Sequence, residues 1–334
     1  MDVLIVNQSE VAQLLPMHEC IAVMEQALVT LARGDAILPL RPVMWLPERV
    51  GALGMMPSYL GDIAAMGLKA ISVFPGNHGT EYDSHQGVVL LFETTHGRLL
   101  SIVDATSVTA IRTAAVSAVA TKLLARAEAG DLAILGSGTQ ARVHLEAMGL
   151  VRKLRRARVW SQHHENATRF AQRESARLGL TVEALPTAQN AVDGADLVCT
   201  TTSAREPVLK GEWLAPGAHI NAVGSSVKFT RELDTAAVAR ARLFVDRRES
   251  TLNEAGDFLF PKQEGAIGDE HIQAEIGELL LAQMPGRQSP DEITLFKSLG
   301  LAIEDLAAAQ HIYTKAIETQ MGTWLPIGGR HGGE

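Results

Sequence analysis

A short run of small residues in the middle of the chain has the spacing of a dinucleotide-binding turn. The apolar segment Leu132 to Leu135 leads directly into Gly136-Ser137-Gly138-Thr139-Gln140-Ala141, and an amphipathic segment follows to Leu150. In this Gly-x-Gly-x-x-Ala pattern the first glycine permits a tight turn, the second lets backbone approach a pyrophosphate, and the alanine lets the helix pack on the strand. The helix N-terminus adds free N–H groups for phosphate oxygens. The pattern predicts a nicotinamide or flavin dinucleotide site, although the same turn can join a strand to a helix and bind nothing.

The residue that contacts the adenosine ribose is expected at the end of the next strand, about 20 residues past this turn. That strand, Arg158 to Trp160, is followed by Ser161, Gln162 and His163, with no aspartate or glutamate among them. An acid there would favour NAD(H), whereas these three side chains can donate hydrogen bonds to the 2′-phosphate of NADP(H). We therefore favour NADP(H). NAD(H) stays the alternative, because Glu165 could reach the ribose and the turn could be merely exposed.

Two further segments place polar groups where strands are expected to end. Cys199 is followed by Thr200, Thr201, Thr202 and Ser203, and Asn221-Ala222-Val223-Gly224-Ser225-Ser226 closes another strand. In open parallel sheets the ligand crosses the carboxyl ends of the strands, so both segments would line the nicotinamide half of a dinucleotide. Either one alone is also ordinary loop chemistry.

Three cations stand in or beside apolar segments in the first third of the chain. Arg41 opens a strand, Lys69 lies inside Gly67-Leu68-Lys69-Ala70-Ile71, and Arg112 begins an Ala- and Val-rich helical stretch. A single cation in such a setting usually extends its charge to solvent or forms an internal salt bridge. Three of them in a domain that faces a dinucleotide site suggest a clamp for a substrate carboxylate.

The elements that carry these residues change character along the chain. Ser9 is expected to cap a first helix that Pro16 interrupts, and Gly34 to end the second. Short β-like segments follow, and the last two form a hairpin through residues 95–98. They are Val43–Leu46, Leu53–Met56, Lys69–Phe74, Val88–Phe92 and Leu99–Val103. An Ala-rich helix over about Thr106–Ala127 closes this mainly antiparallel region.

Beyond Asp131 strands and helices alternate, which predicts βαβ units and a parallel sheet. The expected strands are Leu132–Leu135, Arg158–Trp160, Thr181–Ala184, Leu197–Thr200, His219–Val223, Leu243–Val245 and Ile293–Phe296. A long final helix, from Leu301 to Ile317, is expected to return to the first domain. We therefore predict an α/β protein with a Rossmann dinucleotide-binding domain (residues 126–304) inserted in a discontinuous α+β substrate and dimerisation domain (residues 1–125 plus 305–334).

Composition excludes several functional classes. The 334 residues carry a net charge of −8, which argues against a general nucleic-acid or anionic-membrane binder. The basic run from Arg152 to Arg158 is expected to be a solvated loop. Two distant cysteines imply neither disulfides nor structural zinc, and the eleven histidines show no metal-ligand spacing, so we expect no metal. Without a signal peptide or a membrane-length apolar run, a cytoplasmic protein is expected.

Taken together and in order, these motifs resemble the ornithine cyclodeaminase/μ-crystallin family over essentially the whole length. The motifs that carry the resemblance are Arg41, Met55-Met56-Pro57, Lys69, Ser84-His85-Gln86-Gly87, Arg112-Thr113-Ala114-Ala115, Gly136 to Ala141, Asn221-Ala222-Val223-Gly224 and Arg231-Glu232-Leu233-Asp234. The resemblance implies a homodimer whose terminal segments form the substrate and dimerisation domain.

The resemblance also implies roles for single residues. Arg41, Lys69 and Arg112 would face the carboxylate and the reacting nitrogen of a small imino or amino acid, with Lys69 catalytic and Met56 beside them. Together with the residues argued above, the expected cofactor contacts are Ser84, Arg112, Thr113, Gly136, Gly138, Thr139, Gln140, Ser161, Gln162, His163, Thr201, Thr202, Val223, Gly224, Ser225, Ser226 and Ser298.

One departure from the family pattern selects among its reactions. Cyclodeaminases of the family have an aspartate two residues after the glycine of Asn-Ala-Val-Gly, where this chain has Ser226. A serine hydroxyl is not a comparable base at neutral pH. We therefore expect NAD(P)H-dependent reduction of a cyclic ketimine, such as Δ1-pyrroline-2-carboxylate or Δ1-piperideine-2-carboxylate, to proline or pipecolate. The alternatives are an acyclic imine reductase like alanine dehydrogenase or iminosuccinate reductase, an ornithine cyclodeaminase, and a non-catalytic NADPH- or small-ligand-binding protein.

Overall fold

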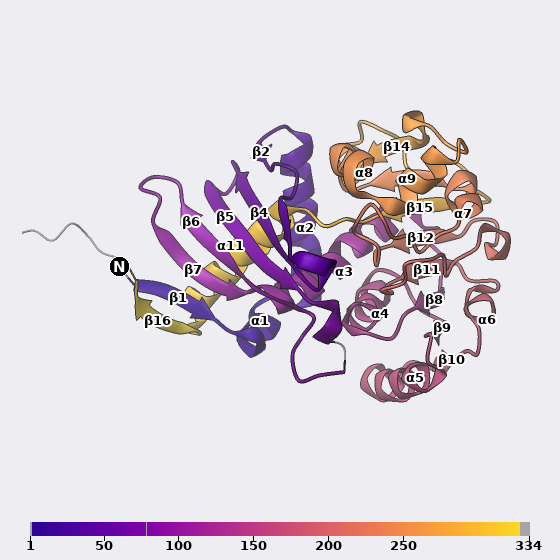
Figure 1. The fold of residues 1–334 in the computed structure, drawn as a ribbon, viewed down its shortest axis with the longest axis horizontal. Coiled ribbons are helices and arrows are strands. Elements are labelled where there is room, and N and C mark those ends of the chain that lie inside the picture. The colour runs from indigo at the N-terminus through magenta and orange to yellow at the C-terminus, as the bar shows by residue number, and fades with distance from the viewer. Residues whose placement is uncertain (1, 78, 328–334) are drawn as a thin grey trace, which may run out of the picture. The chain divides into compact units, whose positions relative to one another are not determined.

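Two sheets organise two units of the chain in the computed structural model, which describes residues 2–77 and 79–327 (Figure 1). The first unit comprises Met1–Arg112 and Leu301–Glu334, and the second comprises Thr113–Gly300. The chain therefore leaves the first unit inside one helix and re-enters it just before another. The sequence pattern had placed these divisions at residues 125 and 304.

The first unit is built on a mostly antiparallel sheet in the order β16-β1-β7-β6-β5-β4-β2, with β3 also paired to β4. Its strands are β1 (Asp2–Val6), β2 (Ala36–Ile37), β3 (Val43–Trp45), β4 (Ala52–Leu60), β5 (Ala65–Val73), β6 (His85–Glu93), β7 (Leu99–Asp104) and β16 (Thr323–Pro326). β6 and β7 form the predicted hairpin. The strand β1 and the short edge strands β2 and β16 were not predicted.

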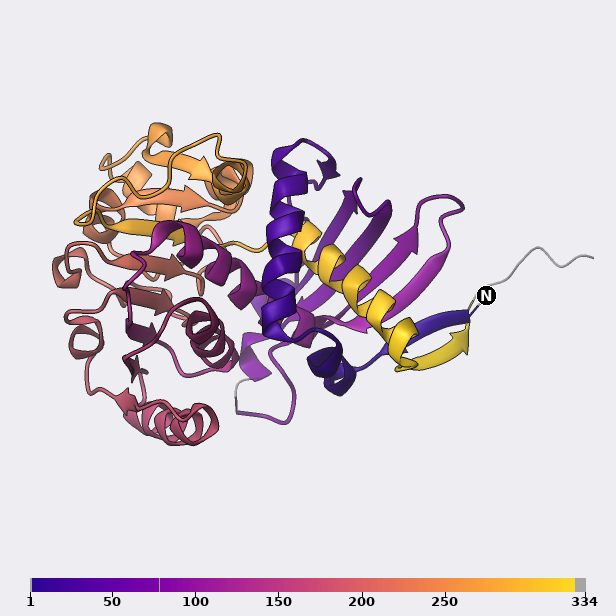
Figure 2. The same ribbon diagram turned by 180° about the vertical axis from the view of Figure 1, so that it is seen from behind.

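Helices cover one face of this sheet. They are α1 (Gln8–Leu14), α2 (Met17–Ala32) and α11 (Ala302–Thr319), and the 3₁₀ turns η1 (Pro47–Arg49) and η2 (Pro75–Asn77) lie between strands. Figure 2 shows α11 lying across the strands with α2 beside it, and α11 contacts β4, β5 and β6. Because α11 crosses the central strands, residues in its first turn can meet side chains that project from them.

The first helix does not begin as predicted. Its N-cap is Asn7, whose side chain accepts hydrogen bonds from the backbone N–H groups of Ser9 and Glu10. Glu10 in turn accepts from the backbone N–H of Asn7, which completes a capping box. Ser9 therefore lies inside the helix, because the reciprocal pair satisfies more N–H groups than a serine cap would. The predicted ends at Pro16 and Gly34 are confirmed: Pro16 caps α2, and Gly34 follows it with φ of +78°.

Helix α3 (Ala105–Leu124) is long and apolar enough to cross a membrane by length and composition, but 72% of its apolar stretch is buried inside the protein. The bent pair α1 and α2 passes the same test as one broken span. Buried core helices commonly pass such a test, so it is weak evidence for a membrane span.

The second unit is a doubly wound sheet of parallel strands in the order β10-β9-β8-β11-β12-β15-β13-β14. Its strands are β8 (Asp131–Leu135), β9 (Arg156–Trp160), β10 (Val182–Ala184), β11 (Leu197–Thr200), β12 (His219–Ala222), β13 (Arg242–Val245), β14 (Ile272–Glu275) and β15 (Thr294–Lys297). Its helices are α4 (Thr139–Val151), α5 (His164–Leu178), α6 (Ala188–Val192), α7 (Thr235–Arg240), α8 (Arg248–Glu254), α9 (Gly256–Gln263) and α10 (Ile276–Leu280), with 3₁₀ turns η3 (Gly211–Trp213) and η4 (Asp269–His271). The Rossmann-type architecture is thus confirmed, and the strand order reverses between β8 and β11.

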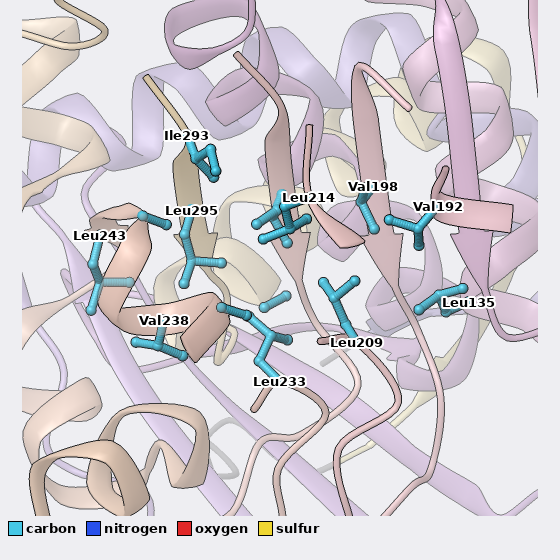
Figure 3. Packing of buried hydrophobic residues seen from close by; sticks show 14 of the residues in the cluster. Leu135, Val192, Val198, Leu209, Leu214, Leu233, Val238, Leu243, Ile293 and Leu295 are labelled. Carbon is cyan, nitrogen blue, oxygen red and sulfur yellow. The ribbon is translucent and has the colours of Figure 1, made fainter. Parts of the chain in front are cut away.

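The core of this second unit explains why its strands read as unbroken apolar runs. Leu135, Val198 and Leu295 are buried on β8, β11 and β15, and Leu209 and Leu233 belong to the same core from the connecting segments (Figure 3). Parallel strands are covered on both faces, so no alternation of polar residues is required.

The basic run from Arg152 to Arg158 is only partly the solvated loop that was predicted: residues 152–155 form a loop in which Lys153 and Arg155 are exposed, but Arg156 and Arg158 lie in β9 and Arg152 binds backbone carbonyls. Arg152 donates to the carbonyl of Thr121 in the last turn of α3 and to those of Ala125 and Arg126 just past its end, and so satisfies groups that the helix leaves unpaired. Arg158 lies in β9, is 5% exposed, and donates to carbonyls around α6. The local cluster of charges did not predict these hydrogen bonds, because the carbonyl partners are distant in sequence.

Candidate functional site

The turn between β8 and α4 has the geometry that a dinucleotide requires. Gly136 has φ of +120°, and a Cβ there would lie 2.7 Å from Thr201 Oγ1, so only glycine fits. Gly138 is the N-cap of α4, and a Cβ added to it would meet nothing within 4 Å. No side chain caps the helix, so its first N–H groups remain available for an anion.

An open hollow of about 250 Å³ lies at this turn, lined by Ser137, Gly138, Thr139, Arg142 and Arg173. Two guanidinium groups beside a helix N-terminus make it a site for phosphate oxygens. Nearby, the buried Oε1 of Gln140 has no hydrogen-bond partner among the described residues. These observations fit a dinucleotide. Arg142 and Arg173 were not predicted, although Arg142 lies in the first turn of the helix that the glycine pattern predicts.

The predicted ribose segment lies at the end of β9. The Ser137 hydroxyl donates to Ser161 Oγ at 3.0 Å, which joins this segment to the glycine turn. Gln162 and His163 are exposed, and His163 is the N-cap of α5. Glu165, the alternative residue for contact with the ribose, lies in the first turn of α5 and so close in sequence to this segment.

The predicted strand-end residues gather at the carboxyl edge of the parallel sheet. Thr201 donates from both its N–H and its hydroxyl to the Leu135 carbonyl, at 2.8 and 3.1 Å. Val223 N–H donates to the Thr200 carbonyl, and Ser298 N–H donates to the Ala222 carbonyl, each at 3.0 Å. The structure thus brings together Gly136 to Gln140, Thr201, Thr202, Val223 to Ser226 and Ser298.

A fully buried glutamate that was not assigned a role ties these loops together. Glu232 is 0% exposed and accepts hydrogen bonds from Thr200, Thr202 and Gly224. Burial and the neighbouring Asp257 raise the pKa of Glu232, against the hydrogen bonds of Thr202, which lower it. Its sequence signal was its place in the family motif at residues 231–234.

The other predicted residues lie outside this edge. In the first unit, the Ser84 hydroxyl is 3.0 Å from His85 Nδ1, just before and at the start of β6. Thr113 is buried on α3. Met56 on β4 lies opposite Lys69 on β5, and Arg41 is partly exposed ahead of β3.

The first unit holds a compact cluster of buried charges. Lys69 Nζ donates to both carboxylate oxygens of Asp305, at 3.1 and 3.2 Å. Arg112 Nε donates to Asp305 at 3.0 Å and its Nη1 donates to Glu304 at 2.6 Å. None of the four side chains is more than 4% exposed. We call Lys69, Arg112, Glu304 and Asp305 the charge cluster.

The internal salt bridge that was weighed for these cations is therefore present. Glu304 and Asp305 lie in the first turn of α11 and were not predicted. Two acids in the apolar first half of this helix were a usable signal, because buried acids require partners. Their partners, however, lie about 190 or more residues earlier in the chain, with separations of 192, 193 and 236.

The surroundings of this cluster shift the pKa of Lys69 toward neutral pH. Burial lowers the pKa of Lys69 to about 8, Asp305 opposes the change, and the charges of Arg112 and Arg41 add to it. Burial alone would lower the pKa of Arg112, but Asp305 and Glu304 raise it. Arg112 is therefore a fixed cation, whereas Lys69 can hold or release a proton close to physiological pH.

A search of residues 2–77 and 79–327 finds no group of three or more histidine, cysteine, aspartate or glutamate side chains placed to hold a metal ion. The expectation that no metal is required stays a prediction, which turnover after exhaustive chelation would test.

Comparison with known proteins gives consistent matches. A model of the ornithine cyclodeaminase/mu-crystallin family matches residues 1–320. Ketimine reductase mu-crystallin of Mus musculus is 40% identical over 293 residues, which cover 87% of this chain and 90% of that protein. The structure of Thermococcus litoralis Delta(1)-pyrroline-2-carboxylate reductase in complex with NADH and L-proline matches with a TM-score of 0.94 and 40% identity, covering 96% and 99% of the two chains. An archaeal alanine dehydrogenase dimer with bound NAD matches with a TM-score of 0.93 and 32% identity, covering 98% and 100%.

Proposed function

The chain belongs to the ornithine cyclodeaminase/mu-crystallin family, and on that premise we propose that it is a cytoplasmic NAD(P)H-dependent reductase of cyclic ketimine carboxylates. Its substrates are Δ1-pyrroline-2-carboxylate or Δ1-piperideine-2-carboxylate, and its products proline or pipecolate. The observation that carries the proposal is Lys69, a buried cation with a pKa of about 8 held against Asp305. A protein that only stores a ligand has no need of a titratable group there, which speaks against the non-catalytic alternative.

The first unit, which we take to be the substrate domain, binds and polarises the imine. Arg112 and Arg41 hold the substrate carboxylate through charge-assisted hydrogen bonds, and Met56 packs beside it. Lys69 in its ammonium form donates to the imine nitrogen, which keeps C2 electrophilic. Holding both groups of the substrate fixes the face of C2 that is presented for reaction. The reduced nicotinamide, when bound, supplies the hydride.

The second unit binds the cofactor, and we favour NADP(H) over NAD(H). Ser161, Gln162 and His163 offer donors and no carboxylate at the end of β9, and Arg173 lines the adjacent hollow. The structural relatives hold NADH or NAD, which keeps NAD(H) in view. Glu165 is the residue through which an NAD(H) preference would arise.

A homodimer is part of the proposal. Strands of the first unit expose large apolar side chains, among them Met44 and Trp45 on β3 and Trp324 and Leu325 on β16, each at least 44% exposed. The two pairs lie toward opposite edges of the sheet, and exposed apolar patches on sheet edges commonly mark an interface. The archaeal alanine dehydrogenase relative is a dimer. Light scattering of the purified protein tests this, and a monomer at micromolar concentration contradicts it.

The test of the reaction compares cyclic imine acids and pyruvate plus ammonia with either reduced cofactor, and ornithine with either oxidised cofactor, because cyclodeamination must begin with oxidation of the amino acid. We expect fast oxidation of the cofactor with cyclic imine acids, slower oxidation with pyruvate plus ammonia, and no useful conversion of ornithine to proline, because Ser226 lacks the basicity of the family's aspartate. A preference for the acyclic imine would favour the alanine dehydrogenase alternative, which the 32% identical relative supports. Efficient conversion of ornithine with no reduction of cyclic imines would contradict the proposal.

A further inference from the structure

We propose that Glu232 is a positioning residue that fixes the two loops which receive the nicotinamide half of the cofactor. The inference rests on the proposed use of a nicotinamide dinucleotide. Glu232 Oε1 accepts from the N–H and the hydroxyl of Thr202, both at 2.7 Å. Its Oε2 accepts from the Thr200 hydroxyl at 2.8 Å and from Gly224 N–H at 2.7 Å. One carboxylate thereby joins the loops after β11 and β12.

The hydrogen-bonding capacity of this carboxylate is filled. An ionised carboxylate offers about four acceptor sites, and four donors occupy them. All of these donors are neutral backbone or hydroxyl groups, and Glu232 is fully buried, so loss of the carboxylate removes the acceptor of the buried Thr200 hydroxyl and of the partly buried N–H and hydroxyl of Thr202. The cost falls on the loops, because Thr202 and Gly224 both lie beyond the ends of their strands.

The two loops meet with no space between them. A Cβ added to Gly224 would lie 2.1 Å from the Thr202 carbonyl oxygen and 2.5 Å from Glu232 Oε1. A displacement of the carboxylate is therefore transmitted to both loops. Thr201, between Thr200 and Thr202, extends the contact to the glycine turn through its bonds to the Leu135 carbonyl.

Glu232 is itself held from behind. The backbone N–H groups of Glu232 and Leu233 donate to Asp257 Oδ1 at 2.8 and 3.0 Å. Lys297 Nζ donates to Asp257 Oδ2 at 2.9 Å and to the Ser225 carbonyl at 2.5 Å. Lys297 is 1% exposed at the end of β15. The loop after β12 is therefore held at two successive residues, Gly224 by Glu232 and Ser225 by Lys297. We call Glu232, Asp257 and Lys297 the loop clamp.

The strand order says which part of the cofactor these loops meet. A dinucleotide lies across the point where the order reverses, between β8 and β11, with its pyrophosphate on the glycine turn. The adenosine half lies toward β9, at Ser161. The nicotinamide half then lies toward β11 and β12, whose ends carry the loops bound by Glu232.

Binding measurements with a whole cofactor and a fragment test this role directly. ADP-ribose carries the adenosine and pyrophosphate but no nicotinamide, so it serves as the probe for the other half. Glu232→Gln replaces one carboxylate oxygen by an amide NH2 that opposes two donors. We expect it to weaken NADH binding by about ten- to a hundredfold and to leave ADP-ribose binding within about threefold of the parent protein, as measured by calorimetry.

Two further variants keep the test decisive. Glu275→Gln is the control, because Glu275 is a partly buried acid that, like Glu232, accepts from a backbone N–H, that of Arg248, but lies at the end of the edge strand β14. It should change neither affinity. If Glu232→Gln does not fold, the isosteric substitution Thr200→Val removes one of the hydroxyl donors to Glu232. It should weaken NADH binding by about threefold to tenfold and leave ADP-ribose binding unchanged.

Three results would overturn the inference. Equal loss of NADH and ADP-ribose binding would make Glu232 a general structural residue, and unchanged binding of both would give it no positioning role. A parent protein that binds neither NADH nor NADPH would refute the cofactor and the proposed function with it. The first two results leave the proposed function standing.

Discussion

The charge cluster of the first unit and the loop clamp of the second bury similar groups in different ways. In the cluster, two cations and two carboxylates pair directly, and Lys69 donates to both carboxylate oxygens of Asp305. An uncharged Lys69 amine still has two N–H groups for Asp305, so it can lose a proton without leaving an acceptor empty. In the clamp, a proton on Glu232 must displace one of four donors. The first arrangement tolerates a change of charge, and the second resists it.

The largest effect should come from removing the group that changes charge. Lys69→Ala is expected to lower turnover of a cyclic imine by about a hundred- to ten-thousandfold, with a smaller rise in KM, because it removes the proton donor to the reacting nitrogen. Steady-state kinetics measures both quantities. Lys315→Ala, which removes a lysine paired to Glu19 on the same unit, is the control and should leave turnover unchanged. A change confined to KM would reduce Lys69 to a binding residue.

Removing the fixed cation should affect binding and stability together. Arg112→Ala is expected to raise KM for the imine acid by about ten- to a hundredfold. It also leaves Glu304 and Asp305 with Lys69 as their remaining cation in the cluster, so the free energy of unfolding should fall by about 3–5 kcal/mol. Denaturant unfolding measures the second effect, with the exposed Arg98→Ala as control. An unaffected KM would remove Arg112 from the substrate site.

The comparison also predicts a dependence on pH. Lys69 is protonated below its pKa of about 8, so imine reduction should decline as pH rises through that value, and the reverse oxidation of the amino acid should increase. Asp305 raises the pKa of Lys69. Asp305→Asn should therefore move the decline in reduction to lower pH. A profile that does not move in this variant would contradict the assignment of the titrating group to Lys69.

The smallest expected effect concerns the cofactor. Arg173→Ala should weaken NADPH binding by several-fold and NADH binding little, because Arg173 follows the ribose segment on α5 and lines the hollow at the glycine turn. Fluorescence titration of both cofactors measures it. Arg169→Ala, on the same helix but paired to Asn166, is the matched control. Equal losses for the two cofactors would place Arg173 at the pyrophosphate.

Local sequence patterns predicted what local forces determine. The glycine turn, the parallel strands and the hairpin of β6 and β7 follow from spacing and periodicity within about ten residues, and they are present. The pairing of Lys69 with Asp305 could not be predicted, because one residue comes before the inserted unit and the other after it. The burial of Arg158 was missed because its carbonyl partners lie 32 and 35 residues away. The cap at Asn7 is local, since Asn7 and Glu10 are three residues apart, so the sequence carried a usable signal that the choice of Ser9 overlooked.

The interrupted path of the chain has a consequence for synthesis on the ribosome. Glu304 and Asp305 emerge only after the whole inserted unit, 192 or more residues behind the cations they neutralise. Until then Lys69 and Arg112 have no carboxylates from α11, and the sheet lacks the helix that crosses it. The inserted unit, whose residues are contiguous, can fold while the first is still incomplete. The first unit, which contains Lys69, is therefore the last to reach its native structure. A chain that ends before Leu301 would contain the whole second unit and a first unit without α11.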